Sequence, residues 1–278
     1  MHDPPLGPLR AKILDEIMSC APKFANAWGM TSSATHEHPL DNPVWHTLRG
    51  RLSRFAASHS TDELVHFDPE VSVFSAVDTM DEACWGWVAK LVGPEGFCGF
   101  FRDAIPAAPV GWEEHFRAPC LQMIAADVAA PSGVEVVRLG VDDAAEMLAL
   151  ANLTEPGPFA IRTFELGRYV GVRRDDVLIA MAGERFRVPG FVELSGVCTH
   201  PDARGEGLAG ELTLDVVQSI RAGGDEAMLH VLESNENAIR LYKKLGFIVR
   251  RSVDVVFAQW HGRDWRPSEG EPQSFEGG

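Results

Sequence analysis

The chain has 278 residues, a formal net charge of −15 and 45% hydrophobic residues, a balance typical of a globular enzyme with a sizeable core. This acidity argues against nucleic acid as a partner, because binding a phosphate backbone needs a positive surface. No apolar run is long enough to cross a membrane, and the first residues lack a signal-peptide pattern, so we expect a cytoplasmic protein that does not bind membranes.

In chain order, the first part of the sequence predicts helices at 8–20 and 43–56, a strand at 71–77, a helix at 81–92, and strands at 96–102 and 120–125. Residues 126–133 are small or turn-forming and mark a linker. Beyond it we expect a strand at 134–139, a helix at 142–151, strands at 169–172, 177–186 and 191–199, a helix at 207–222, a strand at 227–232, a helix at 236–245 and a strand at 247–259. The order predicts an α/β fold with a mixed sheet over 134–260, a separate α/β half over 1–126, and a disordered tail at 267–278.

Cysteine and histidine spacing does not favour a metal or disulfide framework. The five cysteines are scattered and form no CxxC pair; they are Cys20, Cys84, Cys98, Cys120 and Cys198. An odd, dispersed set is typical of free thiols in a reducing compartment. The triplet His36, Glu37 and His38 has no second ligand pair nearby, so we expect no metal site.

The segment 197–209 has the pattern of an anion-binding loop. A strand ends at a turn marked by Pro201, and six residues then lead into a helix: Arg204, Gly205, Glu206, Gly207, Leu208 and Ala209. Glycines let the backbone approach a ligand closely, and the free N–H groups of the first helical turn point at it. The positive end of the helix makes such a site independent of net charge, which this acidic chain requires.

Gly205, Gly207 and Gly210 also spell GxGxxG, with an acidic pair at Asp225 and Glu226 about twenty residues later, as in dinucleotide-binding folds. Three features argue against that interpretation. Other residues separate the strand from the glycines, the acidic pair precedes a strand instead of following one, and only about seventy residues remain for the rest of a doubly wound sheet.

A second motif follows in the segment 229–247. Asn235, Ala238 and Tyr242 are spaced by three and four residues and therefore share one face of a helix. Taken alone, Tyr242 would be interpreted as a core aromatic with its hydroxyl at the rim.

Together the two motifs resemble those of the GNAT acyltransferase superfamily. The first matches (Arg/Gln)-x-x-Gly-x-(Gly/Ala) at Arg204, Gly207 and Ala209, and the second matches Asn-x-x-Ala-x-x-x-Tyr followed by Leu-Gly-Phe at 245–247. The resemblance covers roughly residues 134–260. The long first half is similar to the two-part branch that includes glycine N-acyltransferase-like proteins.

The resemblance implies an N-acyltransferase that uses acetyl-CoA as co-substrate and needs no metal. The residues it implies for CoA are the loop 204–209, the strand end Val197, Cys198 and Thr199, and the helix residues Asn235 and Ala238. It implies that a backbone N–H, that of Cys198, polarises the thioester carbonyl. Tyr242 would protonate the departing thiolate.

Glu193 is the candidate general base. It precedes Val197 by four residues and shares its face if the strand is regular, whereas a bulge would change this. A solvent-facing carboxylate is an equal alternative, and His200 and His230 are weaker candidates.

The first half resembles the middle of a GNAT domain at 71–102. We expect a degenerate GNAT-like half that shapes the acceptor pocket, with further acceptor contacts from the loop 154–159. The expected acceptor is a small-molecule amine or amino acid, or a protein N-terminus, and the protein is expected to be a monomer or a homodimer. Two other functions stay open: a catalytically inactive CoA-binding module, and a nicotinamide-dependent oxidoreductase.

Overall fold

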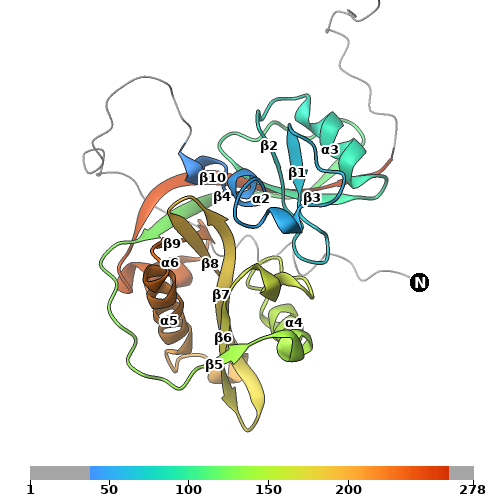
Figure 1. The fold of residues 1–278 in the computed structure, drawn as a ribbon. Helices are drawn as coiled ribbons and strands as arrows, with labels where there is room; N and C mark the ends of the chain where they lie inside the picture. The colour runs from blue at the N-terminus through green and yellow to red at the C-terminus, as the bar shows by residue number, and fades with distance from the viewer. Residues whose placement is uncertain (1–37, 263–278) are drawn as a thin grey trace, which may run out of the picture.

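The computed structural model describes residues 38–262 (Figure 1). The helix expected at 8–20 and the tail expected at 267–278 lie outside the described residues, as do His36 and Glu37. His38, the last member of that histidine-containing triplet, accepts a hydrogen bond from the Leu40 N–H through its Nδ1 at 3.1 Å. Its imidazole therefore begins a short 3-10 turn.

One mixed sheet of eight strands runs in the order β3-β10-β4-β9-β8-β7-β6-β5. Its strands are β3 (Phe97–Arg102), β4 (Trp112–Ala125), β5 (Val137–Leu139), β6 (Tyr169–Arg174), β7 (Val177–Val188), β8 (Phe191–Thr199), β9 (Glu226–Leu232) and β10 (Phe247–Trp260). All pairings in this sheet are antiparallel except β8 with β9. The predicted α/β class with a mixed sheet is confirmed, and a largely antiparallel sheet is unlike the parallel sheet of a doubly wound dinucleotide-binding fold.

Helices cover both faces of the β6–β8 region. Helix α4 (Ala144–Thr154) lies on one face and α5 (Leu208–Ala222) on the other (Figure 1). Strand alternation explains this arrangement: Met181 packs in the cluster of α4, whereas the neighbouring Ala180 and Ala182 pack in the cluster of α5. Helix α6 (Glu236–Lys244) follows β9, so the second-half elements occur in the predicted order.

The first part of the chain adds smaller elements at the other end of the sheet (Figure 1). These are α2 (Pro43–Leu48), α3 (Cys84–Val92) and a two-stranded sheet of β1 (Leu64–His66) and β2 (Ser75–Val77). Short 3-10 turns occur at Pro39–Asp41, Ser53–Phe55, Val141–Asp143, Thr163–Leu166 and Pro201–Ala203. The helix predicted at 43–56 ends at Leu48, because the following Arg49, Gly50 and Arg51 form a turn and glycine is a poor helix former.

Strand β4 comes from before the linker yet lies between two strands that come after it. It pairs with β10 on one side and with β9 on the other. Residues 126–133 contain no helix or strand, as expected for a linker, and the strand expected at 134–139 begins only at Val137. The hydrogen-bonded sheet is therefore continuous across the segment that the sequence marks as a boundary.

Strands β8 and β9 pair over only three positions. Phe191, Val192 and Glu193 face residues 226–228 in parallel register, and the ladder stops there. Beyond that point β8 continues along β7, and β9 continues along β4. The two strands therefore separate, and one backbone edge of β8 from Leu194 onward has no strand beside it.

Gly246 joins α6 to β10 where the linker crosses, and it gives the first prediction. Its φ is +96°, and a Cβ there would overlap the carbonyl of Asp127. Gly190 has a φ of +80° but open space around it, so it is a matched control for backbone strain alone. We expect Gly190→Ala to lower the free energy of unfolding by about 1 kcal/mol, and Gly246→Ala to lower it by at least about 1 kcal/mol more. Urea unfolding measures both, and equal losses would show that the linker does not constrain this turn.

Candidate active site

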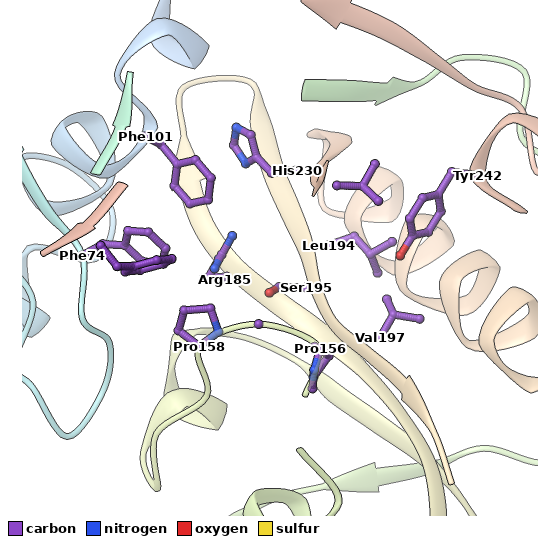
Figure 2. Close-up of a pocket in the computed structure, with 14 residues that line it drawn as sticks. Phe74, Phe101, Pro156, Pro158, Arg185, Leu194, Ser195, Val197, His230 and Tyr242 are labelled. Carbon is purple, nitrogen blue, oxygen red and sulfur yellow. The ribbon is translucent and has the colours of Figure 1, made fainter. Parts of the chain in front are cut away.

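Two adjoining hollows lie where β8 and β9 separate. The outer groove has a volume of about 670 Å³ and the inner cavity about 50 Å³. Val197, Pro156 and Tyr242 line both, so they form the boundary between them. Figure 2 shows the inner cavity, with Val197 and Tyr242 at one side and Phe74 and Phe101 at the other.

The outer groove brings together nearly all of the predicted cofactor residues. Those that line it are Val197, Cys198, Thr199, Arg204, Gly205, Gly207, Leu208, Ala209, Asn235 and Ala238. Glu206 does not line it; its carboxylate pairs with Arg174 on the surface at 2.5 Å. The two sequence motifs, separated in the chain by most of α5 and by β9, thus form opposite walls of one groove.

The glycine loop holds the start of α5 open to this groove. Gly205 and Gly207 have φ values of +87° and +83°, which side-chain-bearing residues rarely adopt. A Cβ at either position would meet open space, so the backbone itself forms the wall. Leu208 begins a 15-residue helix directly after Gly207, and its first-turn N–H groups have no partner within the helix. This geometry suits a phosphate or pyrophosphate group.

Helix α6 forms the opposite wall. The Asn235 side chain caps the helix by accepting a hydrogen bond from the Ala238 N–H at 2.8 Å. This cap fixes the first turn, and the small Ala238 leaves room beside it. Tyr242, one turn further on, is 7% exposed and packs against Phe247 with ring centroids 5.7 Å apart. Its ring is therefore part of the core while it borders both hollows.

The register of β8 decides which N–H groups face the open edge. The backbone N–H of His200 donates to the Ile179 carbonyl at 2.7 Å, and Cys198 lies opposite Met181 in β7. Because N–H directions alternate along a strand, Cys198 also donates toward β7, and the N–H groups of Val197 and Thr199 point toward the split. Thr199 in addition has a buried hydroxyl with no hydrogen-bond partner within residues 38–262.

A bulge interrupts β8 just before these residues. Ser195 lies opposite Gly183 and Cys198 opposite Met181, so β8 has one residue more than β7 over this stretch. Gly196 takes up the bulge with a φ of +63°. The extra residue moves Val197 off the face that Glu193 and Ser195 share, and the regular alternation assumed from the sequence does not hold.

Glu193 lies deep in the protein and is fully engaged. Its carboxylate receives hydrogen bonds from Arg185 at 2.9 Å and 2.7 Å and from His230 Nδ1 at 2.7 Å. Burial, the largest single effect, would raise the pKa of this carboxyl, but the Arg185 charge and the hydrogen bonds from Arg185 and His230 together outweigh it and lower the pKa to about 2. At neutral pH such a carboxylate is a very weak proton acceptor.

His230 has both ring nitrogens in use as well. Gln122 donates from its amide nitrogen to the Leu40 carbonyl at 2.8 Å, and its oxygen accepts from Arg250 at 2.6 Å, so its orientation is fixed. The same amide nitrogen lies 3.0 Å from His230 Nε2, which must therefore accept. His230 is then the neutral tautomer with its proton on Nδ1, directed at Glu193.

Several lining residues are absent from the sequence-based set. They are Arg185 and the rings of Phe74, Phe101 and Phe257, which line the inner cavity together with His230, a weaker candidate for the base in the sequence analysis. The phenylalanines come from three separate parts of the chain, and no local motif connects them. For Arg185 there was one signal: the apolar first half of β7 is followed by three charged residues, Glu184, Arg185 and Arg187.

Neither a membrane-spanning helix nor a group of metal-binding side chains occurs within residues 38–262.

The buried ion pair predicts how stability depends on pH. The pKa of Glu193 falls from 4.5 to about 2 on folding. Its contribution to the free energy of unfolding is therefore complete above about pH 4.5 and is lost as the pH falls toward 2. We expect the wild type to lose on the order of 3 kcal/mol more unfolding free energy than Glu193→Gln across this window. Urea unfolding at pH 7 and pH 2.5 measures the difference, and parallel losses in the two proteins would contradict it.

Comparison with known proteins adds independent findings. The sequence profile described as FR47-like protein matches residues 169–256. A solved structure described as a member of the GNAT family, from Novosphingobium aromaticivorans, is 40% identical, covers 81% of this chain and 99% of its own, and superposes with a TM-score of 0.74. A GCN5-related N-acetyltransferase from Kribbella flavida is 20% identical, covers 79% of this chain and 93% of its own with a TM-score of 0.54, and so shares the fold.

Curated relatives match over a shorter segment. The mycothiol acetyltransferase of Thermobispora bispora is 44% identical over 66 residues, which is 23% of this chain and 22% of that protein. The mycothiol acetyltransferase of Thermomonospora curvata is 40% identical over 85 residues, 30% of this chain and 28% of that protein. The matched segments thus span between a fifth and a third of these relatives.

Proposed function

The chain belongs to the GNAT family of acetyltransferases, and from this premise we propose that it transfers an acetyl group from acetyl-CoA to the amine of a small molecule. The observation that carries the proposal is the outer groove, which leads from the open N-terminus of α5 past the unpaired edge of β8 to Tyr242. Local similarity to mycothiol acetyltransferases supports a small-molecule acceptor.

The loop 204–209 would hold the pyrophosphate of CoA. Backbone N–H groups at the start of α5 supply hydrogen bonds, and the helix dipole supplies positive charge where the chain as a whole is acidic. Asn235 and Ala238 would border the cofactor on the opposite wall.

The pantetheine arm would extend along the open edge of β8. The N–H groups of Val197 and Thr199 face this side, so an extended amide chain can pair with them as a further strand would. We assign polarisation of the thioester carbonyl to the Val197 N–H, which lies at the boundary with the inner cavity, in place of the Cys198 N–H.

Tyr242 is the proposed general acid. The amine attacks the thioester carbonyl, the C–S bond breaks as the C–N bond forms, and the departing thiolate takes a proton from the Tyr242 hydroxyl. Its place between the groove and the cavity suits a group that meets the sulfur. A phenol can serve because a thiolate is itself fairly basic.

For Glu193 we propose a positioning role instead of the base role. Both of its oxygens are occupied, and its pKa of about 2 makes it unsuited to take a proton from an amine. The amine proton would pass to solvent through the outer groove. Glu193 holds Arg185 and His230 in place around the inner cavity.

The first test is cofactor choice. Acetyl-CoA at about a hundred times its dissociation constant should add about 2.7 kcal/mol of stability, whereas NAD should add none, and thermal unfolding with each ligand measures this. A shift with NAD alone would support the oxidoreductase alternative and remove the proposal.

Ala209→Glu adds a negative charge and bulk in the groove, so it should abolish the stabilisation by acetyl-CoA. It should not destabilise the unliganded fold, because an acidic residue suits a first helical turn. Gln218→Glu, exposed on the same helix, is the matched control.

The second test separates an enzyme from an inactive CoA-binding module. We expect Tyr242→Phe to lower kcat at least about 100-fold with little change in the KM for acetyl-CoA, since the hydroxyl acts on the leaving thiolate and not in cofactor binding. Release of free CoA thiol in the presence of an amine measures the rate. A Tyr242→Phe protein as active as the wild type would remove the acid role of Tyr242.

A further inference from the structure

Most of the residues that line the inner cavity have apolar side chains. They include Phe74, Phe101, Phe257, Leu194, Pro156 and Pro158. Its volume of about 50 Å³ is room for about two water molecules, so only a small group can enter. In such a site, the few polar groups that face the space decide which ligand is accepted.

Arg185 is the charged side chain of this wall. Its Nε and one terminal nitrogen, Nη2, are bound to Glu193, while Nη1 has no hydrogen-bond partner among the described residues. Three phenylalanine rings hold the guanidinium, with its Cζ 5.0 Å from the centroid of Phe74, 5.4 Å from Phe101 and 4.5 Å from Phe186. The side chain is thus fixed on two edges by the protein and keeps one donor edge for a ligand.

Ser195 adds a second polar group to the same wall. It lies opposite Gly183, and Arg185 is the next residue of β7 on that face, so Ser195 and Arg185 are diagonal neighbours across the two strands. Figure 2 shows both between Pro158 and His230. No described residue forms a hydrogen bond with the Ser195 hydroxyl. Two donor side chains therefore line the same small cavity.

The charges around the cavity favour an anion. Glu193 is not among the lining residues, because it lies behind the guanidinium it binds, and no other acidic side chain of residues 38–262 lines the cavity. His230 lines it as the neutral tautomer. The wall thus presents one positive edge and one hydroxyl, and a ligand that buries them without an acceptor oxygen would leave a charged donor unpaired.

We propose that the acceptor is a small amine that also bears a carboxylate, and that Arg185 Nη1 and the Ser195 hydroxyl bind this carboxylate. The inference rests on the proposed acetyl transfer and names its substrate class. With the carboxylate at the Arg185 wall, the amine of a short amino acid is directed toward Val197 and Tyr242, the boundary that the cavity shares with the outer groove.

The test compares amines that differ only in the carboxylate. Glycine is set against glycinamide and alanine against alaninamide, at equal concentrations of unprotonated amine, with acetyl-CoA as donor and CoA release as readout. We expect kcat/KM to be roughly 10- to 100-fold higher for each carboxylate, the size of one hydrogen bond to a charged group. The double variant R185Q/E193Q, which removes both buried charges together, should lose this preference, and Ser195→Ala should reduce it.

The control is E184Q/R187Q. That ion pair lies on the same strand but outside the cavity, so this variant should keep the preference for carboxylates. Equal rates for both members of each pair, or a preference unchanged in R185Q/E193Q, would overturn the inference and leave acetyl transfer intact. If neither kind of amine releases CoA, the proposed function fails. Thermal stabilisation of the CoA-loaded protein by glycine against glycinamide then still decides which chemistry the cavity binds.

Discussion

The parallel ladder between β8 and β9 ends after three positions, and the site depends on that ending. β9 is already committed to β4 from Met228 to Leu232, and β8 to β7 through Thr199. Each strand keeps its partner on the outer side, while the two strands diverge from each other on the inner side. The early end of the β8–β9 ladder produces the unpaired edge of β8, the groove that continues to α5 and the cavity beneath it.

The proposed function places an anionic cofactor on a protein with a net charge of −15. The repulsion by the net charge and the attraction at the start of α5 act over different distances, so they do not conflict. Exposed charges are screened beyond about 8 Å at physiological ionic strength, whereas a phosphate at the start of α5 would lie in direct contact with backbone N–H groups. Gly205 and Gly207 matter here because their left-handed backbone exposes these groups and no side chain covers them.

What the sequence could predict was local. The glycine loop and the Asn235–Tyr242 helix are short motifs whose spacing alone fixes which groups face together, and nearly all of their residues line one groove. The inner cavity depends on pairing between distant segments: β4 lies between β9 and β10, and β3 carries Phe101 to the wall. The bulge at Gly196 could not be located from alternation, so the faces of Glu193 and Val197 were assigned under a regularity that β8 lacks.

The buried Arg185–Glu193 ion pair is better explained by a role in ligand binding than by a contribution to the stability of the fold. Moving two charged groups out of water commonly costs more free energy than their mutual attraction recovers. A protein with an apolar pair of similar size in the same place is often as stable. Here Glu193 also binds His230, and three rings enclose the guanidinium, so the arrangement fixes one orientation of Arg185. A protein that needed only a packed core at this position would have no use for a donor edge without a protein partner. An edge held rigidly and left open is what recognition of a ligand oxygen requires.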